Sequence, residues 1–373
     1  MRNPLETGLQ IYLQSLAKIS KAEGYLSPEA FINLPFDENN LKHVMEVAKE
    51  TPETDLIIII GIGGSSLGVR AIYEVLENRR ASAPKLIFLD QINLEKIQIL
   101  VEKLENEQQA ATVITISKSG KTFETVKNYE ILRKSLPKNK QFREIFITGK
   151  NSELALKAQK EKKAILEIPK EVGGRFSVFS PAGLFPLSLA KIDIIELLKG
   201  AMVARQELLN KSSVETLSQS NQVFQNYQRG KEIYNIFIFS PKLKTLGLWY
   251  QQLLAESLGK EGRGLFPTIS EGSKDLHSLQ QYFVGGKQNV QHEFIITEDE
   301  NKYQKNILRA VQETYKEKGI PFRTTVLQEA DESSLGFFME TKMIETLLLA
   351  KLLKVNPFGQ PNVDNYKQKI REA

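Results

Sequence analysis

The chain has 373 residues, with 50 lysines and arginines against 45 aspartates and glutamates, three histidines and no cysteine. Without cysteine it can form no disulfide framework, thiolate zinc site or iron–sulfur cluster, and it has no cysteine nucleophile. The net charge of +5 is small for this length, so charge alone does not decide between an anionic small substrate and nucleic acid.

The beginning of the chain is typical of a protein that is neither secreted nor inserted in a membrane. The first residues contain no apolar stretch like that of a secretory signal, and the longest apolar run, 56–62, is too short to span a bilayer. We therefore expect a cytoplasmic protein with no membrane partner. Apolar residues at helical spacing over 9–19 and 39–49 predict a helical N-terminal segment over residues 1–50.

From residue 56 onward, short apolar runs alternate with helical patterns. The run over 56–60 contains four isoleucines, as expected for a strand buried on both faces of a parallel sheet. Further strand-like runs follow at 86–89, 112–116, 145–147, 164–166, 236–239, 294–296 and 324–327. This alternation predicts an α/β fold with two doubly wound parallel-sheet domains. We assign them to residues 51–190 and 191–354, followed by a C-terminal segment over 355–373.

A glycine-rich turn, GIGGSSLG over residues 61–68, follows the first predicted strand. A strand that leads through glycines into a helix directs backbone N–H groups at an anion or a polar ligand. The dinucleotide-binding pattern would need a glycine where Ser66 stands. This turn alone leaves three interpretations open: a tight structural turn, a dinucleotide site, and a site for a polar or phosphorylated small ligand.

A second turn, SKSGKTFET over residues 117–125, lies between another predicted strand and a helix. Its hydroxyl side chains around Gly120 suit a phosphate cradle, and an ordinary Ser/Thr helix cap is the alternative. It is not a Walker A loop, because Thr115 stands where that motif needs glycine. Because neighbouring strand ends share one crevice, the two turns together favour a common ligand site.

Three further segments carry residues suited to acid–base or electrostatic chemistry. Arg175 follows two glycines, and its fixed fork of donors suits an anion that develops during a reaction; a surface salt bridge is the alternative. Gln252 and Glu256 share one helix face, which makes Glu256 a candidate base or a solvent-facing carboxylate. His277 follows a loop rich in glycine and serine, although a lone histidine is more often structural.

Taken together and in this order, the segments resemble the glucose-6-phosphate isomerase (phosphoglucose isomerase) family, in particular its short bacterial forms. The first two turns resemble the family's sugar-binding turn and phosphate loop. VGGRFSVFSPAG over 172–183 resembles a signature stretch, and QQLLAESLGKEGRG over 251–264 with DLHSLQQYF over 275–283 resembles the catalytic region. NPFGQPNVDNYKQKI over 356–370 resembles the C-terminal signature, with Gly359, Asn362 and Asp364 departing from the usual residues.

The resemblance implies reversible aldose–ketose isomerisation of glucose 6-phosphate and fructose 6-phosphate through an enediolate, in glycolysis and gluconeogenesis. It implies a homodimer. We expect no cofactor and no metal, because the isomerisation needs no redox cofactor and the sequence has no obvious metal-ligand cluster. Glu256 would move the proton between C1 and C2, and Arg175 would stabilise the enediolate. The partner subunit's His277, together with Lys367, would assist ring opening. Phosphate contacts are implied for Ser117, Lys118, Ser119 and Thr122, and sugar contacts for Gly64, Ser65 and Gln252.

The chemistry agrees with this assignment, because aldose–ketose isomerisation needs a base, groups for ring opening and a cation, but no redox cofactor. Three alternatives stay open. One is an isomerase that also accepts mannose 6-phosphate. Another is a non-catalytic sugar-phosphate regulator, which would need none of Glu256, His277 and Lys367. The third is a nicotinamide-dependent dehydrogenase, which the missing third glycine disfavours. The stretch between His277 and Lys367 is short for the family, so we expect peripheral elements to be trimmed there. No nucleic-acid partner is expected.

Overall fold

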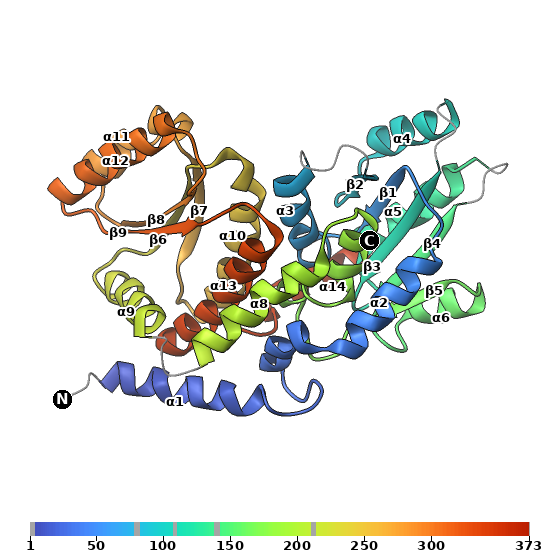
Figure 1. Cartoon of the computed structure of the whole chain (residues 1–373), viewed down its shortest axis with the longest axis horizontal. Coiled ribbons are helices and arrows are strands. Elements are labelled where there is room, and N and C mark those ends of the chain that lie inside the picture. Colours follow the sequence, from blue (N-terminus) through green and yellow to red (C-terminus); the bar gives the residue numbers. More distant parts are fainter. Residues whose placement is uncertain (1–3, 78–82, 107–109, 138–141, 210–213, 373) are drawn as a thin grey trace. The chain divides into compact units, whose positions relative to one another are not determined.

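The computed structural model describes residues 4–77, 83–106, 110–137, 142–209 and 214–372. The chain forms two compact units, and each combines stretches that are far apart in sequence (Figure 1). The β1–β5 unit contains Gly24–Ile194 and Gln360–Ala373. The β6–β9 unit contains Met1–Glu23 and Ile195–Gly359.

The β1–β5 unit is built around a parallel sheet with the strand order β2-β1-β3-β4-β5. Its strands are β1 (Leu56–Ile60), β2 (Lys85–Leu89), β3 (Ala111–Ser117), β4 (Arg143–Thr148) and β5 (Ala164–Glu167). Its helices are η1 (Pro28–Phe36), α2 (Glu38–Glu50), η2 (Gly63–Ser65), α3 (Leu67–Leu76), α4 (Leu94–Asn106), α5 (Phe123–Ser135), α6 (Glu153–Lys160), η4 (Gly174–Phe176), α7 (Pro181–Leu189) and α14 (Pro361–Glu372). Every residue of β1 is buried, as its continuous apolar sequence predicts.

The β6–β9 unit has a second parallel sheet, with the order β7-β6-β8-β9. Its strands are β6 (Ile233–Ile238), β7 (Phe266–Glu271), β8 (Val290–Thr297) and β9 (Phe322–Leu327). Its helices are α1 (Pro4–Ile19), α8 (Ile194–Leu209), α9 (Val214–Gln228), η5 (Pro241–Leu243), α10 (Lys244–Leu258), η6 (Lys274–Leu276), α11 (Gln280–Gly285), α12 (Lys302–Glu317) and α13 (Glu332–Leu353). Phenylalanines of the sheet pack against α11 and α12 in an aromatic core.

The first four strands of each unit are arranged in the same order, and the strands that pair within each sheet are parallel. These two sheets, with helices around them, confirm the predicted α/β class with two doubly wound parallel-sheet domains (Figure 1). In both sheets the chain reverses its direction of winding beside the first strand. In doubly wound sheets, ligands bind outside the carboxyl ends of the strands at this reversal point.

Seven of the eight predicted strands fall within observed ones, the run over 236–239 extends one residue beyond the end of β6, and β7 was not predicted. This edge strand contains Pro267 and is only partly buried, so it lacks the continuous apolar run of the other strands. The predicted N-terminal segment over residues 1–50 is divided between the units. Helix α1 packs against α9 and α13, whereas α2 packs against α7 in the β1–β5 unit. Among the described helices, none combines the length and apolarity that crossing a bilayer requires.

Candidate functional site

The glycine-rich turn and the arginine segment meet in the β1–β5 unit. The turn leaves the carboxyl end of β1 and forms η2, which packs against η4. A Cβ atom on Gly64 would lie 2.4 Å from the carbonyl carbon of Gly174 and 2.6 Å from the backbone nitrogen of Arg175. Only glycine therefore allows the two backbones to approach this closely. Ser65 belongs to the same short helix as Gly64.

The predicted phosphate loop leaves the carboxyl end of β3, the strand that pairs with β1. Gly120 has a φ of +69°, a left-handed conformation that turns the chain towards α5. The Ser117 and Thr122 hydroxyl oxygens are 3.0 Å apart, and the Ser119 hydroxyl accepts a hydrogen bond from Lys121 N at 3.2 Å. The Thr122 side chain makes no capping bond to α5, so the N-terminal amides of this helix are left for another acceptor.

Lys118 connects the phosphate loop to the segment that carries Arg175. Its ammonium group donates to the carbonyl oxygens of Lys170 at 3.1 Å and Val172 at 3.0 Å. Burial lowers the pKa of Lys118, and the positive charge of Arg175 acts in the same direction. Arg175 is itself buried, and its guanidinium lies 5.4 Å from the centre of the Phe176 ring. The three predicted segments of this unit thus converge at the reversal point of one sheet.

Lys367, the predicted C-terminal site residue, also belongs to the β1–β5 unit. It lies on α14, which packs against α5, the helix that follows the phosphate loop. The Lys367 side chain is half-buried, and its ammonium donates to Gln360 Oε1 at 3.4 Å. The helix with this lysine is therefore attached directly to the element that follows the phosphate loop.

In the β6–β9 unit, Gln252 and Glu256 form the predicted pair on one face of α10. Gln252 Nε2 donates to Glu256 Oε1 at 2.7 Å, and both side chains are half-buried. Among the described residues, no partner donates to Gln252 Oε1, although this atom is buried. A buried acceptor without a donor is costly, so this oxygen is suited to receive a hydroxyl group from a ligand. The pair thus offers a carboxylate beside an open hydrogen-bond acceptor.

His277 lies at the other end of α10 from Glu256. It follows η6 and is exposed. The η6 turn is tied to the end of β7, where Glu271 N donates to Asp275 Oδ2 at 2.8 Å. Glu271 in turn pairs at 2.8 Å with Lys244, the first residue of α10. Glu256 is about 18 Å farther along that helix than Lys244, so the contacts that hold the η6 turn and the Gln252–Glu256 pair lie at different ends of α10.

His292 is buried, in surroundings unsuited to acid–base chemistry. His292 packs against Phe283 and Tyr315 in the aromatic core of the β6–β9 unit. Burial lowers its pKa to about 3, with Lys231 acting in the same direction. It therefore stays uncharged near neutral pH and serves the core. In the part of the chain that the structure describes, no group of three or more histidine, cysteine, aspartate or glutamate side chains could hold a metal ion.

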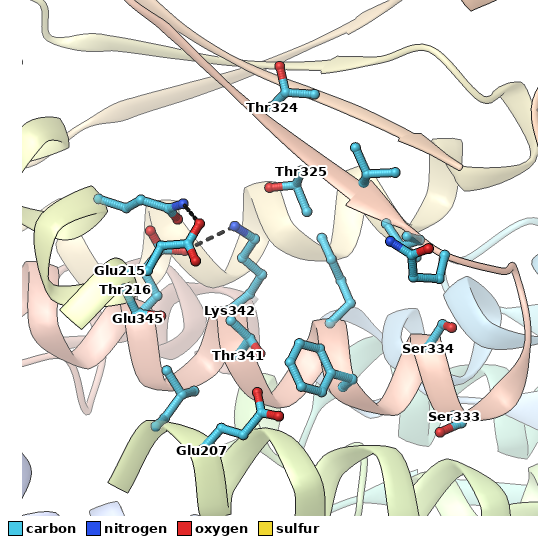
Figure 2. Close-up of a pocket in the computed structure, with 17 residues that line it drawn as sticks. Glu207, Glu215, Thr216, Thr324, Thr325, Ser333, Ser334, Thr341, Lys342 and Glu345 are labelled. Carbon is cyan, nitrogen blue, oxygen red and sulfur yellow. Dashed lines mark hydrogen bonds and ion pairs between the residues drawn. The ribbon is translucent and has the colours of Figure 1, made fainter. Parts of the chain in front are cut away.

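A pocket of about 590 Å³ in the β6–β9 unit lies away from all the predicted site residues, none of which lines it (Figure 2). At one side Lys342 points towards Glu345, and their charged atoms are 3.0 Å apart. Lys342 also pairs with Glu293 at 2.6 Å, and Arg323 pairs with both glutamates. We call these four residues the Glu293 cluster. It joins β8, β9 and α13 through buried charges, which is a structural role.

Comparison with known proteins identifies the family. The family model described as phosphoglucose isomerase matches residues 47–300. A glucose-6-phosphate isomerase of Methanocaldococcus jannaschii is 30% identical, covering 98% of this chain and 96% of that protein. One from Bacillus cereus is 30% identical, covering 91% of this chain and 85% of that protein.

Solved structures show the same fold. A hypothetical protein from Thermus thermophilus has a TM-score of 0.87 at 28% identity, covering 99% of this chain and 94% of that one. A glucose-6-phosphate isomerase from Chlamydia trachomatis has a TM-score of 0.79 at 20% identity, covering 98% and 77% of the two chains. With the family match over most of its length, the chain belongs to the phosphoglucose isomerase family.

Proposed function

We propose that this enzyme interconverts glucose 6-phosphate and fructose 6-phosphate through an enediolate intermediate. The observation that carries the proposal is the convergence of the glycine turn, the phosphate loop and buried Arg175 at the reversal point of one sheet. The named relatives are glucose-6-phosphate isomerases, which supports the same reaction. A cytoplasmic location stays a prediction.

In this proposal, the hydroxyl groups of the phosphate loop and the first amides of α5 bind the substrate phosphate. The candidate phosphate residues are Ser117, Lys118, Ser119 and Thr122. The phosphate does not react, but the free energy of binding it holds the sugar in place and orients C1 and C2 for the reaction. Gly64, Ser65 and Gln252 contact the sugar, the last through its open Oε1.

Glu256 removes a proton from C2 of the open-chain aldose. The electron pair of the C2–H bond forms a C1=C2 double bond, the π pair of the C1 carbonyl moves onto O1, and the Arg175 guanidinium stabilises the resulting enediolate charge. Glu256 then returns its proton to C1 while the hydroxyl proton passes from O2 to O1, which leaves C2 as the carbonyl of the ketose. Arg175 is suited to this task because a buried cation interacts more strongly with a developing anion than an exposed one. Lys367 and the partner subunit's His277 assist opening of the sugar ring before this step.

We infer that two chains share each site. Within one chain, the η6 turn before His277 is linked through Glu271 to Lys244 at the start of α10, whereas Glu256 lies about 18 Å farther along that helix, which is longer than one hexose phosphate. His277 is also exposed in the single chain. A residue that enters the site of a neighbouring subunit is expected to be exposed when that subunit is absent. A homodimer in which His277 enters the other subunit's site satisfies both observations.

The purified enzyme should convert fructose 6-phosphate to glucose 6-phosphate with no added metal or nucleotide. We expect this because acid–base and electrostatic groups suffice for the reaction. A coupled assay measures the product, with mannose 6-phosphate tested in parallel to define the epimer range. A folded protein that binds sugar phosphate without turnover would refute the isomerase and favour a regulator.

Mixing two inactive variants should restore activity if the sites are shared. Glu256→Gln lacks the base and His277→Ala lacks the ring-opening group, but a mixed dimer contains one site with both groups. After subunit exchange at equal concentrations, we expect about a quarter of the wild-type activity, since half the dimers are mixed and each has one intact site. Mixed dimers that stay inactive while exchange is demonstrated by mass spectrometry would contradict the shared site.

A further inference from the structure

We propose that Lys260 is a positioning residue for the isomerase reaction, because it fixes the connection that leads from α13 to Lys367. The proposal rests on the proposed function and adds a residue that sequence reasoning did not single out. Lys260 is the second residue after the end of α10, four positions beyond Glu256. It is buried, unlike most of the lysines that the structure describes.

The turn after α10 holds Lys260 in a defined place. Lys260 N donates to Arg263 O at 3.1 Å, and Arg263 N donates back to Lys260 O at 2.9 Å. Gly264 has a φ of +119°, and a Cβ there would lie 2.3 Å from Leu258 O. Glycine is therefore required for the chain to leave this turn so close to the end of α10. The backbone of the turn is thus fixed to the helix that carries Glu256.

The Lys260 ammonium donates to three carbonyl oxygens of a distant part of the same unit. These belong to Asn356 at 2.5 Å, Phe358 at 2.9 Å and Gly359 at 3.1 Å. An ammonium has three N–H groups, so the three carbonyls match its full donor capacity. We call residues 356–359 the held segment. Within it, Asn356 Oδ1 accepts a hydrogen bond from Phe358 N at 2.9 Å, which closes the segment into a turn.

The held segment is the starting point of α14. That helix begins at Pro361, two residues after Gly359, and Lys367 lies in its second turn. One side chain therefore fixes residues 356–359, the part of the β6–β9 unit that the chain leaves just before α14. A misplacement of about 1 Å in a catalytic group can lower a rate about 100-fold. Loss of the hydrogen bonds that hold residues 356–359 should therefore lower kcat by displacing Lys367.

The test is a double-mutant cycle between Lys260 and Lys367. We expect Lys260→Met to lower kcat for fructose 6-phosphate about 30-fold or more while KM changes less than about 3-fold. In a Lys367→Met background, the same change should cost less than about 2-fold, because the group through which it acts is gone. Lys260→Arg, which keeps a cation with several donors, should recover part of the rate.

Arg263→Met is the matched control. Arg263 lies in the same turn and donates to Leu353 O at 3.2 Å, at the end of α13 and upstream of the held segment. Its loss should change kcat less than about 3-fold. The proposal is overturned if the fold losses in kcat of Lys260→Met and Lys367→Met multiply in the double variant. It is also overturned if Lys260→Met and Arg263→Met lower kcat equally.

Hydrogen exchange separates failure of this inference from failure of the proposed function. In Lys260→Met, exchange should rise over residues 356–367 and stay unchanged over most of α13, whether or not the protein turns over sugar phosphate. Unchanged exchange over 356–367 refutes the positioning role. A wild-type protein with no turnover refutes the isomerase, and faster exchange then still shows that Lys260 holds the connection.

Discussion

Replacing Glu256 with glutamine should lower kcat for both directions of the isomerisation by about 10³-fold or more, with little change in substrate affinity. The change removes the base and leaves the phosphate loop intact, since the two lie on different elements. Glutamine has nearly the same size and can still accept the 2.7 Å hydrogen bond from Gln252. The measurements are coupled-assay kinetics, exchange of the C2 proton for deuterium, and the Kd for fructose 6-phosphate by calorimetry.

Glu261→Gln is the control for this experiment. Glu261 is an exposed glutamate five residues farther along the chain, in the turn that follows α10. Its replacement should leave kcat within about 2-fold of wild type, because it removes only a surface charge. If C2 proton exchange persists at the wild-type rate in Glu256→Gln, Glu256 is not the base.

Replacing Lys342 with methionine should destabilise the protein by about 3–5 kcal/mol. Lys342 has hydrogen bonds of 2.6 Å to Glu293 and 3.0 Å to Glu345, and both glutamates are fully buried. The substitution leaves two buried carboxylates with only Arg323 to balance them. Urea unfolding measures the loss, with the fluorescence of Trp249, the one tryptophan of the sequence, as the signal.

Lys242→Met is the matched control, because the Lys242–Asp299 pair at 3.1 Å is partly exposed to solvent. Its loss should cost less than about 1 kcal/mol. If the two variants lose equal stability, the Glu293 cluster does not stabilise the fold as proposed. Should Lys342→Met fail to fold, the double variant Lys342→Met/Glu345→Leu, which removes one charge of each sign, should be the more stable of the two.

The Glu293 cluster also gives stability a pH dependence. Burial by itself would raise the pKa of Glu293, but Arg323 and Lys342 outweigh it and hold the pKa below the ordinary range. The pKa of Glu345 is lowered by the same two cations against its burial. A group whose pKa is lower in the folded state stabilises the protein above its unfolded value. This contribution should therefore be lost as the pH falls below about 4.

The sequence was most informative where one property repeats along an element. The isoleucines of β1 mark a strand buried on both faces, and the glycines and hydroxyls after β1 and β3 mark the ligand end of the sheet. Strand β7 was missed because Pro267 and its partial exposure remove that signal. Local composition thus predicted the sheets and the loops at their ends.

Contacts between distant segments could not be predicted from the sequence. Lys118 was predicted as a phosphate contact, which stays a prediction, but nothing in SKSGKTFET indicates that its ammonium donates to Lys170 and Val172 carbonyls. The sequence around Lys260 likewise does not indicate its hydrogen-bond partners, because these lie far along the chain, near the C-terminal end of the β6–β9 unit. The separation of Glu256 and His277 follows from how α10 runs beside β7, which only the tertiary structure reveals.

The division of the chain between the two units sets an order for folding during synthesis. Helix α1 is made first, but it packs against α13, which begins only at Glu332. The strands of the β1–β5 sheet are all translated in the meantime, so that sheet can form before α1 has its partner. Leu9, Leu13 and Leu16 are buried in the finished fold, and until α13 is made, α9 is the one of the two packing partners of α1 that is present. A ribosome-bound or truncated chain that ends before α13 therefore presents part of this apolar face to chaperones or to other nascent chains.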